Sequence, residues 1–150
     1  MEDIRTAKAP LHLWIVGLLS LVWNGFGCTD YLMTRMRNLE WLAQSGGDPK
    51  AMLAWVDSFP LYAQFGWGLG VWLGLAGSVL LLMRHGWAVA AMGLSFIGAI
   101  IGLGYQLFLA PPAPPPMNEG AMTYMPWVII IVAGLLYYYA RRQRIAGVIG

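Results

Sequence analysis

The stretch LYAQFGWGLGVWLGLAGSVLLLM, residues 61–83, decides the fold of this chain because it contains no Asp, Glu, Lys or Arg. A helix needs about 20 apolar residues to cross a hydrocarbon core of about 30 Å. The strand of a membrane barrel would instead have about 10 residues of alternating polarity. The length and uniform apolarity of residues 61–83 therefore predict a membrane-spanning helix.

Three further apolar stretches lie around it, at residues 11–33, 87–110 and 124–140. The whole chain is 59% hydrophobic and only 11% charged, whereas soluble domains contain about 25% charged residues. Its 150 residues suit one domain. We therefore expect an all-α integral membrane protein, with a single transmembrane domain over residues 1–150 that forms a four-helix bundle in the lipid bilayer.

The distribution of Lys and Arg predicts the orientation of the chain. Six of the nine basic residues fall before the first span, between the second and third, or after the fourth: Arg5, Lys8, Arg84, Arg141, Arg142 and Arg144. Since short cytoplasmic loops are enriched in Lys and Arg, both termini are expected in the cytoplasm. The first span could be a secretory signal, but Glu2 and Asp3 weaken its basic start and no small-x-small cleavage site follows it.

The two longer connections have different compositions. The helical period of apolar residues continues past residue 33, from Leu32 through Met36 to Leu39, which predicts that the first helix projects beyond the bilayer. An amphipathic outer loop follows, in which Asp48 can cap a short helix that has Pro49 in its first turn. The later connector APPAPPPMNEG, residues 110–120, favours polyproline geometry. A stiff spacer is the favoured interpretation of this connector, and a recognition surface is the alternative.

Small residues form a stripe on each of the two middle spans. They recur every four residues, which lets helix backbones approach closely in lipid. The predicted helix-packing residues are Gly66, Gly70, Gly74, Ser78, Gly98 and Gly102. The stripes could pack against each other or against another chain, and packing within the chain is the favoured interpretation.

Polar side chains within the spans are the candidate functional residues, because an ionisable residue in a span is costly to insert. The candidate polar site consists of Asn24, Asp30, Tyr31, Gln64 and Gln106. Asn24 lies deepest, on a polar stripe of the first helix that continues through Cys28, Tyr31 and Arg35. Asn24 could link two helices or bind a small polar solute. Asp30 is predicted at the interface, capped by local hydroxyls or paired with Arg35 or Arg37.

Other classes of chemistry find little support in the sequence. The single cysteine, Cys28, excludes an intramolecular disulfide, and we find no nucleophile with a base in register and no cluster with metal-ligand spacing. His12 and His85 could ligate haem from neighbouring helices but are interpreted as surface residues. We therefore predict no enzyme activity, no cofactor and no metal. The absence of a basic cluster argues against nucleic acid as a partner.

The chain resembles a family of small four-helix inner-membrane proteins of proteobacteria that often carry the label "sugar transporter" without a defined activity. The residues that carry the resemblance are Leu21, Trp23, Asn24, Asp30, Tyr31, Met33, Thr34 and Asn38, then Phe59-Pro60, Gly70-Val71-Trp72 and Gly77-Ser78. The resemblance covers the first three predicted helices, and the fourth by hydropathy only. It implies a multi-pass protein of the bacterial inner membrane.

Two functions are expected from these observations. The first is a structural or accessory subunit that packs against other membrane protein subunits or against itself, because a chain of this size is too small to form a roomy pore in one copy. The second is a transporter of small polar, sugar-like solutes that acts as an oligomer and binds them through the candidate polar site.

Overall fold

Four long helices dominate the computed structural model, which describes residues 8–150. They are α1 (Leu11–Arg35), α4 (Leu61–Leu82), α5 (Trp87–Phe108) and α6 (Met125–Ile145), the last preceded by the short 3-10 helix η1 (Gly120–Tyr124). All four are long and apolar enough to cross a membrane, and the described residues contain no strand. The predicted all-helical architecture with four candidate spans is confirmed. The predictions for Glu2, Asp3 and Arg5 lie outside the described residues.

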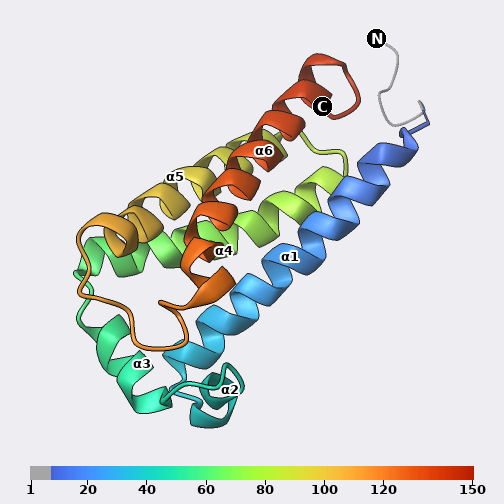
Figure 1. Ribbon diagram of the computed structural model, residues 1–150. Helices are drawn as coiled ribbons and strands as arrows, with labels where there is room; N and C mark the ends of the chain where they lie inside the picture. Colours follow the sequence, from blue (N-terminus) through green and yellow to red (C-terminus); the bar gives the residue numbers. More distant parts are fainter. Residues whose placement is uncertain (1–7) are drawn as a thin grey trace.

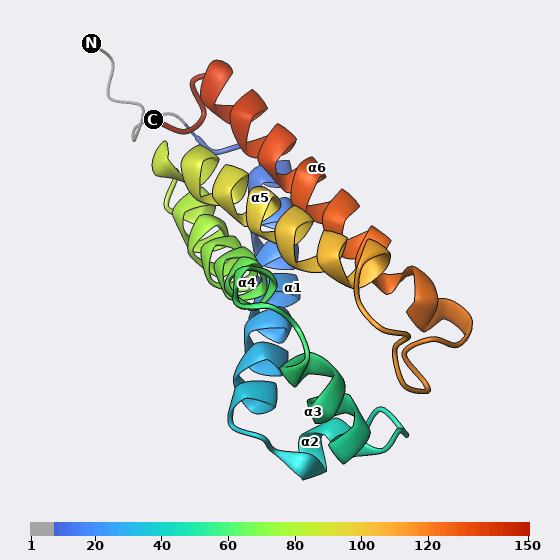
Figure 2. The same ribbon diagram turned by 90° about the vertical axis from the view of Figure 1, so that its left-hand side faces the viewer.

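The central unit of the bundle is the antiparallel pair of α4 and α5, which pack along their length (Figure 1). Arg84 joins them in a tight turn with a φ of 58°. α1 packs mainly against α4, and α6 packs mainly against α5. Figure 2 shows α5 between α4 and α6. α1 and α6 are therefore peripheral helices that flank a central pair.

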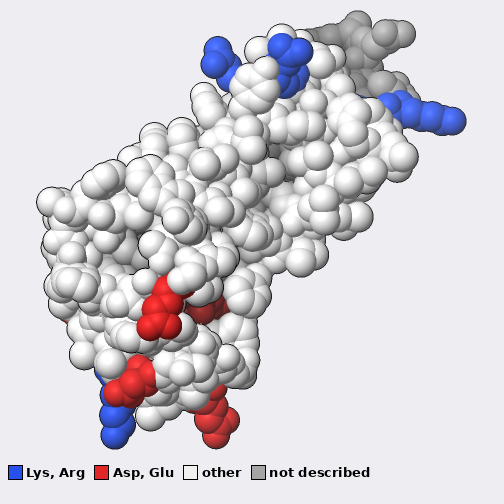
Figure 3. All heavy atoms as spheres, viewed as in Figure 1, with Lys and Arg blue, Asp and Glu red and all other residues white. Residues whose placement is uncertain are grey.

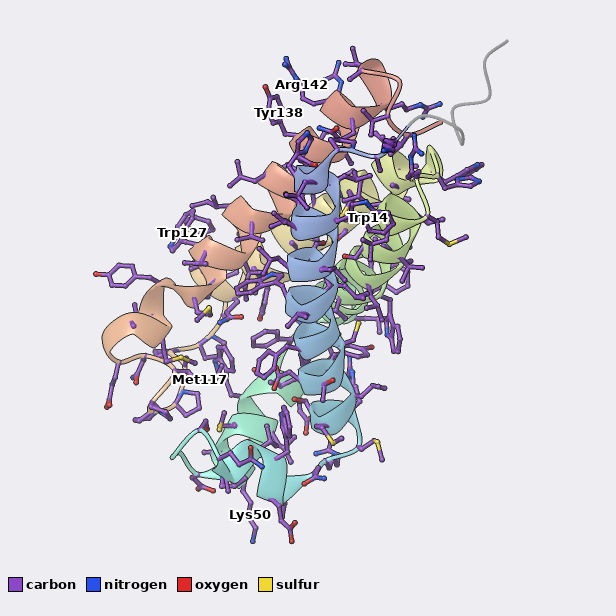
Figure 4. All side chains as sticks on the ribbon, turned by 90° about the vertical axis from the view of Figure 1, so that its right-hand side faces the viewer. Trp14, Lys50, Met117, Trp127, Tyr138 and Arg142 are labelled. Atoms are coloured by element: carbon purple, nitrogen blue, oxygen red, sulfur yellow. The ribbon has the colours of Figure 1, made fainter. Side chains whose placement is uncertain are left out.

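Charged residues separate to the two ends of the bundle. We call the end where α1 and α5 begin and α4 and α6 end the basic end, and the opposite one the loop end. The basic end carries Lys8, Arg84, Arg141, Arg142 and Arg144, whereas the described acidic residues, Asp30, Glu40, Asp48, Asp57 and Glu119, belong to the loop end (Figure 3). Figure 4 shows Arg142 and Lys50 at opposite ends.

A buried apolar cluster holds the four spans together at the basic end. It comprises Leu13, Leu81, Ala88, Met92, Ala140 and Ile149. Each of the four long helices contributes to it, and Ile149 comes from the turn after α6. Nearby, the Nδ1 atom of His12 lies 2.6 Å from the hydroxyl oxygen of Tyr139, which adds a polar contact between α1 and α6. The ends of the peripheral helices are therefore fixed here.

The first helix ends earlier than the continued apolar period predicts. α1 ends at Arg35, Arg37 has a φ of 55°, and a separate short helix, α2 (Leu39–Ala43), follows. The side chain of Asn38 caps α2 by accepting a hydrogen bond from the Trp41 N–H at 3.0 Å. An Asn side chain competes with the helical backbone for hydrogen bonds, so Asn38 ends the first helical segment and starts a second one. The apolar period continues across this break and gave no sign of it.

The loop end is a packed unit. α3 (Pro49–Asp57) begins as predicted, since the Asp48 carboxylate accepts a hydrogen bond from the Lys50 N–H. α2 and α3 share a small buried cluster of Leu42, Met52 and Leu53, on which Met117 of the proline-rich connector packs. The Trp55 Nε1–H donates a 2.8 Å hydrogen bond to the Pro111 carbonyl. The connector thus lies against α2 and α3.

Replacing Trp55 with phenylalanine is expected to loosen this connector. The change keeps an aromatic ring against Phe59 but removes the donor to Pro111, a loss worth about 1 kcal/mol. A glutamate-specific protease should then cut after Glu119 about fivefold faster. Trp14→Phe is the matched control, because Trp14 is exposed on α1. Equal cleavage rates in the two variants would refute the bond's role.

Candidate functional site

The closest helix contact is between the small residues of α4 and α5. A methyl group on Gly98 would lie 2.7 Å from both the Gly66 carbonyl oxygen and the Gly70 nitrogen. A methyl group on Gly102 would lie 2.9 Å from the Trp67 nitrogen. These distances are below van der Waals contact and involve backbone atoms, which cannot rotate away. The predicted glycine stripes therefore face each other within the chain.

A buried hydroxyl adds a hydrogen bond to this contact. The Ser95 Oγ–H of α5 donates to the Gly70 carbonyl of α4 at 2.6 Å. Such bonds between spans are worth about 0.6 kcal/mol on average. They also fix the rotation of the two helices, because the donor and the acceptor must stay in line.

Asn24 lies at the α1–α4 contact in a network with two serines. Its Nδ2 donates to the Ser20 carbonyl at 2.9 Å and lies 3.2 Å from Ser20 Oγ and 3.1 Å from Ser78 Oγ. The two serine Oγ atoms are 2.6 Å apart, and the Ser78 hydroxyl donates to the Gly74 carbonyl. Ser78 thus gives its one proton to its own helix and accepts from Ser20 and Asn24.

This network leaves Asn24 engaged with its neighbours. One Nδ2 proton goes to the Ser20 carbonyl, and the other is shared by the two hydroxyls. A methyl group on Gly74 would collide with Asn24 Oδ1, so the glycine makes room for the amide. One helical turn further along, the Cys28 thiol donates to the Val71 carbonyl at 3.1 Å. The deep part of the polar stripe is therefore a set of interhelical hydrogen bonds.

Tyr31 and Gln64 meet at the loop end of the same stripe, together with Arg35. The Arg35 guanidinium donates to Gln64 Oε1 at 2.7 Å and stacks 5.3 Å from the centre of the Tyr31 ring. Trp67 forms an edge contact with Tyr31, with ring centres 4.9 Å apart. Gln64 in turn donates to the Phe59 carbonyl. The arrangement fixes an exposed cation among aromatic rings.

Asp30 has a different partner from those predicted. Its carboxylate accepts a 3.0 Å hydrogen bond from the Trp41 Nε1–H of α2. Arg35 bonds Gln64, and Arg37 forms an exposed ion pair with Asp57. The prediction of an arginine partner for Asp30 is wrong, because the break after α1 turns Trp41 back toward the carboxylate.

Gln106 remains apart from the other candidates. It lies near the end of α5, half-buried, and among the described residues its side chain has no hydrogen-bond partner. The five candidate polar residues therefore form separate groups: Asn24 with serines, Tyr31 with Gln64, Asp30 with Trp41, and Gln106 alone. Their positions in the predicted spans placed Asp30, Gln64 and Gln106 at a similar depth, with Asn24 deeper, but the fold does not bring them into one site.

Two residues of these hydrogen-bonded groups, Ser20 and Arg35, were not among the predicted site residues. Ser20 precedes Asn24 by four residues and so lies on the same helical face. Extending the polar stripe by one turn would have found it. The pairing of Arg35 with Gln64 could not be read from spacing, because it depends on how α1 crosses α4.

The polar groups described above mainly form hydrogen bonds between helices. The described residues contain no group of three or more His, Cys, Asp or Glu side chains that could hold a metal ion. His12 contacts Tyr139, and His85 accepts a hydrogen bond from the Trp87 N–H. These two imidazoles are engaged with different partners. None of the five candidate polar residues lines the pocket found at the basic end.

Fold and site together define a multi-pass membrane protein whose polar intramembrane residues join its own helices. Comparisons with protein-family models, with curated proteins and with solved structures find no match to this chain.

Proposed function

We propose that this chain is a non-catalytic accessory subunit of the bacterial inner membrane that packs against a larger membrane protein complex. The observation that carries the proposal is the exposure of α6. In the most apolar part of η1 and α6 only 6% of the residues are buried inside the chain, against 39% in that of α4 and 22% in that of α1. α6 contacts α5 on one side, where Phe96 covers Gly134 and Tyr137 covers Gly93. At the basic end α6 also meets α1, where Tyr139 contacts His12, and among the described residues several large side chains along the rest of α6 are exposed.

The exposed side of α6 has the spacing of a helix-packing seam. Apart from Met122, Trp127 and Ile145, the large exposed side chains of η1 and α6 are separated alternately by four and three residues, as in left-handed helix pairs. We call these residues the α6 stripe: Tyr124, Val128, Ile131, Leu135 and Tyr138. Figure 4 shows Tyr138 projecting from α6 away from α4. A second protein's helix laid along this stripe would bury apolar area and give α6 a further neighbour.

The internal polar network supports the same proposal. The side chains of Asn24, Ser20 and Ser78 bond one another and nearby backbone carbonyls, and the Cys28 thiol bonds the Val71 carbonyl. A solute that used these groups would have to break bonds that join α1 to α4. The polar stripe of α1 is thus better suited to holding α1 against α4 than to binding a solute.

Purification in mild detergent tests this function. The protein should elute together with a different membrane protein in a fixed ratio. Leu135→Trp, which adds bulk to the α6 stripe, should abolish this co-elution without changing helix content. Val22→Trp is the matched control on the exposed side of α1 and should leave co-elution intact. Elution as a lone monomer or homodimer would contradict the proposal.

Transport of small polar solutes is the second candidate, favoured by the unpartnered amide of Gln106 near the loop end. This function predicts that Asn24→Leu combined with Asp30→Asn lowers uptake of at least one solute in a broad panel. Uptake that is unchanged for every solute, with normal protein levels in the membrane, would remove this candidate.

A further inference from the structure

The residues after α6 fold back on the turn between α4 and α5. Gly147 has a φ of 71°, which lets the chain reverse. The Arg84 Nε–H donates to the Val148 carbonyl at 3.0 Å, and the Gly150 N–H donates to the Arg84 carbonyl at 3.1 Å. The Gly86 N–H closes the loop on the Gly150 carbonyl at 2.8 Å. These bonds give the basic end a fixed backbone wall.

A pocket of about 430 Å³ lies against this wall. This volume falls in the range of about 300–1,000 Å³ that is common for small-molecule sites. The pocket is lined by His85, Gly86, Trp87, Ala90, Arg144 and Gly150. It is a feature of the tertiary fold, because its residues come from the α4–α5 turn, from the start of α5 and from the end of α6.

Two side chains of the pocket, His85 and Arg144, can donate hydrogen bonds to an anion, whereas the Gly150 carbonyl is an acceptor that already binds the Gly86 N–H. The Trp87 N–H donates to His85 Nδ1 at 3.2 Å, so a neutral His85 ring carries its proton on Nε2, where it can donate. Arg144 forms no ion pair with an Asp or Glu side chain among the described residues, since these side chains belong to the loop end. A guanidinium matches the oxygens of a phosphate group in a planar, two-pronged geometry.

The apolar part of the pocket favours a lipid over a free anion. The Trp87 side chain is 69% exposed and Ala90 is exposed, both on the first turns of an apolar span. Trp residues at the end of a span lie at headgroup level. Basic pockets at the ends of membrane helices bind anionic headgroups. We propose that this pocket binds the phosphate group of an anionic phospholipid, with Arg144 and His85 as donors and Trp87 against the lipid.

Native mass spectrometry of the full chain in detergent tests this site. Phosphatidylglycerol should bind one molecule more tightly than phosphatidylcholine with the same acyl chains. Arg144→Gln should weaken phosphatidylglycerol binding about fivefold to tenfold. Arg142→Gln removes the same charge from the same helix at a residue that does not line the pocket, and it should change binding less than twofold.

Further arms separate the alternatives. Arg144→Lys should recover part of the affinity, since it restores the charge without the planar fork. Inorganic phosphate at millimolar concentration should not displace the lipid; displacement would assign the pocket to free phosphate and overturn the proposal. Equal weakening by Arg144→Gln and Arg142→Gln would also overturn it, because the effect would then come from the general charge of the basic end. Circular dichroism should show the same helix content in all variants.

Discussion

Gly98→Ala is expected to lower the free energy of unfolding by about 1–3 kcal/mol, the usual cost of overpacking a close contact. The added methyl group would meet the Gly66 carbonyl oxygen and the Gly70 nitrogen, each at 2.7 Å. Since both are backbone atoms, α4 and α5 would have to move apart. That movement would also stretch the bond from Ser95 to Gly70. Unfolding by a denaturing detergent, followed by circular dichroism, measures the change.

Gly104→Ala on the same helix is the matched control. A methyl group there would meet nothing within 4 Å. Alanine favours a helix by up to about 1 kcal/mol over glycine, so the control should be neutral or slightly stabilising. Opposite signs for the two variants are the expected outcome. If both variants stabilised the protein, the close approach of α4 and α5 at Gly98 would be refuted.

Ser78→Ala is expected to cost about 1–3 kcal/mol, because the buried Ser20 hydroxyl loses its acceptor and Asn24 loses one of the two hydroxyls that share its proton. The Ser78 side chain is 0% exposed and accepts from Ser20 and Asn24. Without it, α1 should separate more readily from α4. The rate of Cys28 alkylation reports this opening, because this single cysteine is buried between the two helices. We expect faster alkylation together with lower stability.

Thr29→Val provides the comparison for Ser78→Ala. The Thr29 hydroxyl donates to the Gly25 carbonyl of its own helix at 2.9 Å, so its removal leaves the α1–α4 contact unchanged. Alkylation of Cys28 should proceed at the rate of the unaltered protein. The interhelical network would lose its assigned role if Thr29→Val accelerated alkylation as much as Ser78→Ala does.

Much of the fold follows from the sequence because lipid imposes simple requirements. A span needs about 20 apolar residues with its backbone hydrogen bonds made internally, so four apolar stretches predict four helices. Two glycine stripes joined by a short turn predict that α4 and α5 pack closely. The end of α1 was harder to predict, because Asn38 caps α2 while the apolar period continues. Local capping prevailed over periodicity there.

The site could be predicted only in part. The polar face of α1 was readable, because Asn24, Cys28 and Tyr31 share one helical face. Its partners were not, since the pairing of Asn24 with Ser78 depends on the crossing of α1 and α4. The partner of Asp30 depends on the turn that brings Trp41 back. The depth of a residue in the membrane can be estimated from its position in a span. Which residues of two helices meet depends on how the helices are rotated and how they cross, and the sequence alone does not give this.

The structure also separates two roles within one chain. α4 and α5 supply the rigid centre, and polar bonds attach α1 to it. α6 attaches by one side and leaves the α6 stripe uncovered. The proposed accessory role would use this difference, because the chain would keep its own shape while α6 contacts a neighbouring protein.

Photo-crosslinking in intact cells is the most direct test of this account. A photoreactive residue at Leu135 should give one adduct of defined mass with a different membrane protein. The same residue at Met92, which is buried between the helices of the chain, should give none. Adducts from Leu135 with lipid alone, or with a second copy of this chain, would contradict the proposal that the protein is an accessory subunit of a larger complex.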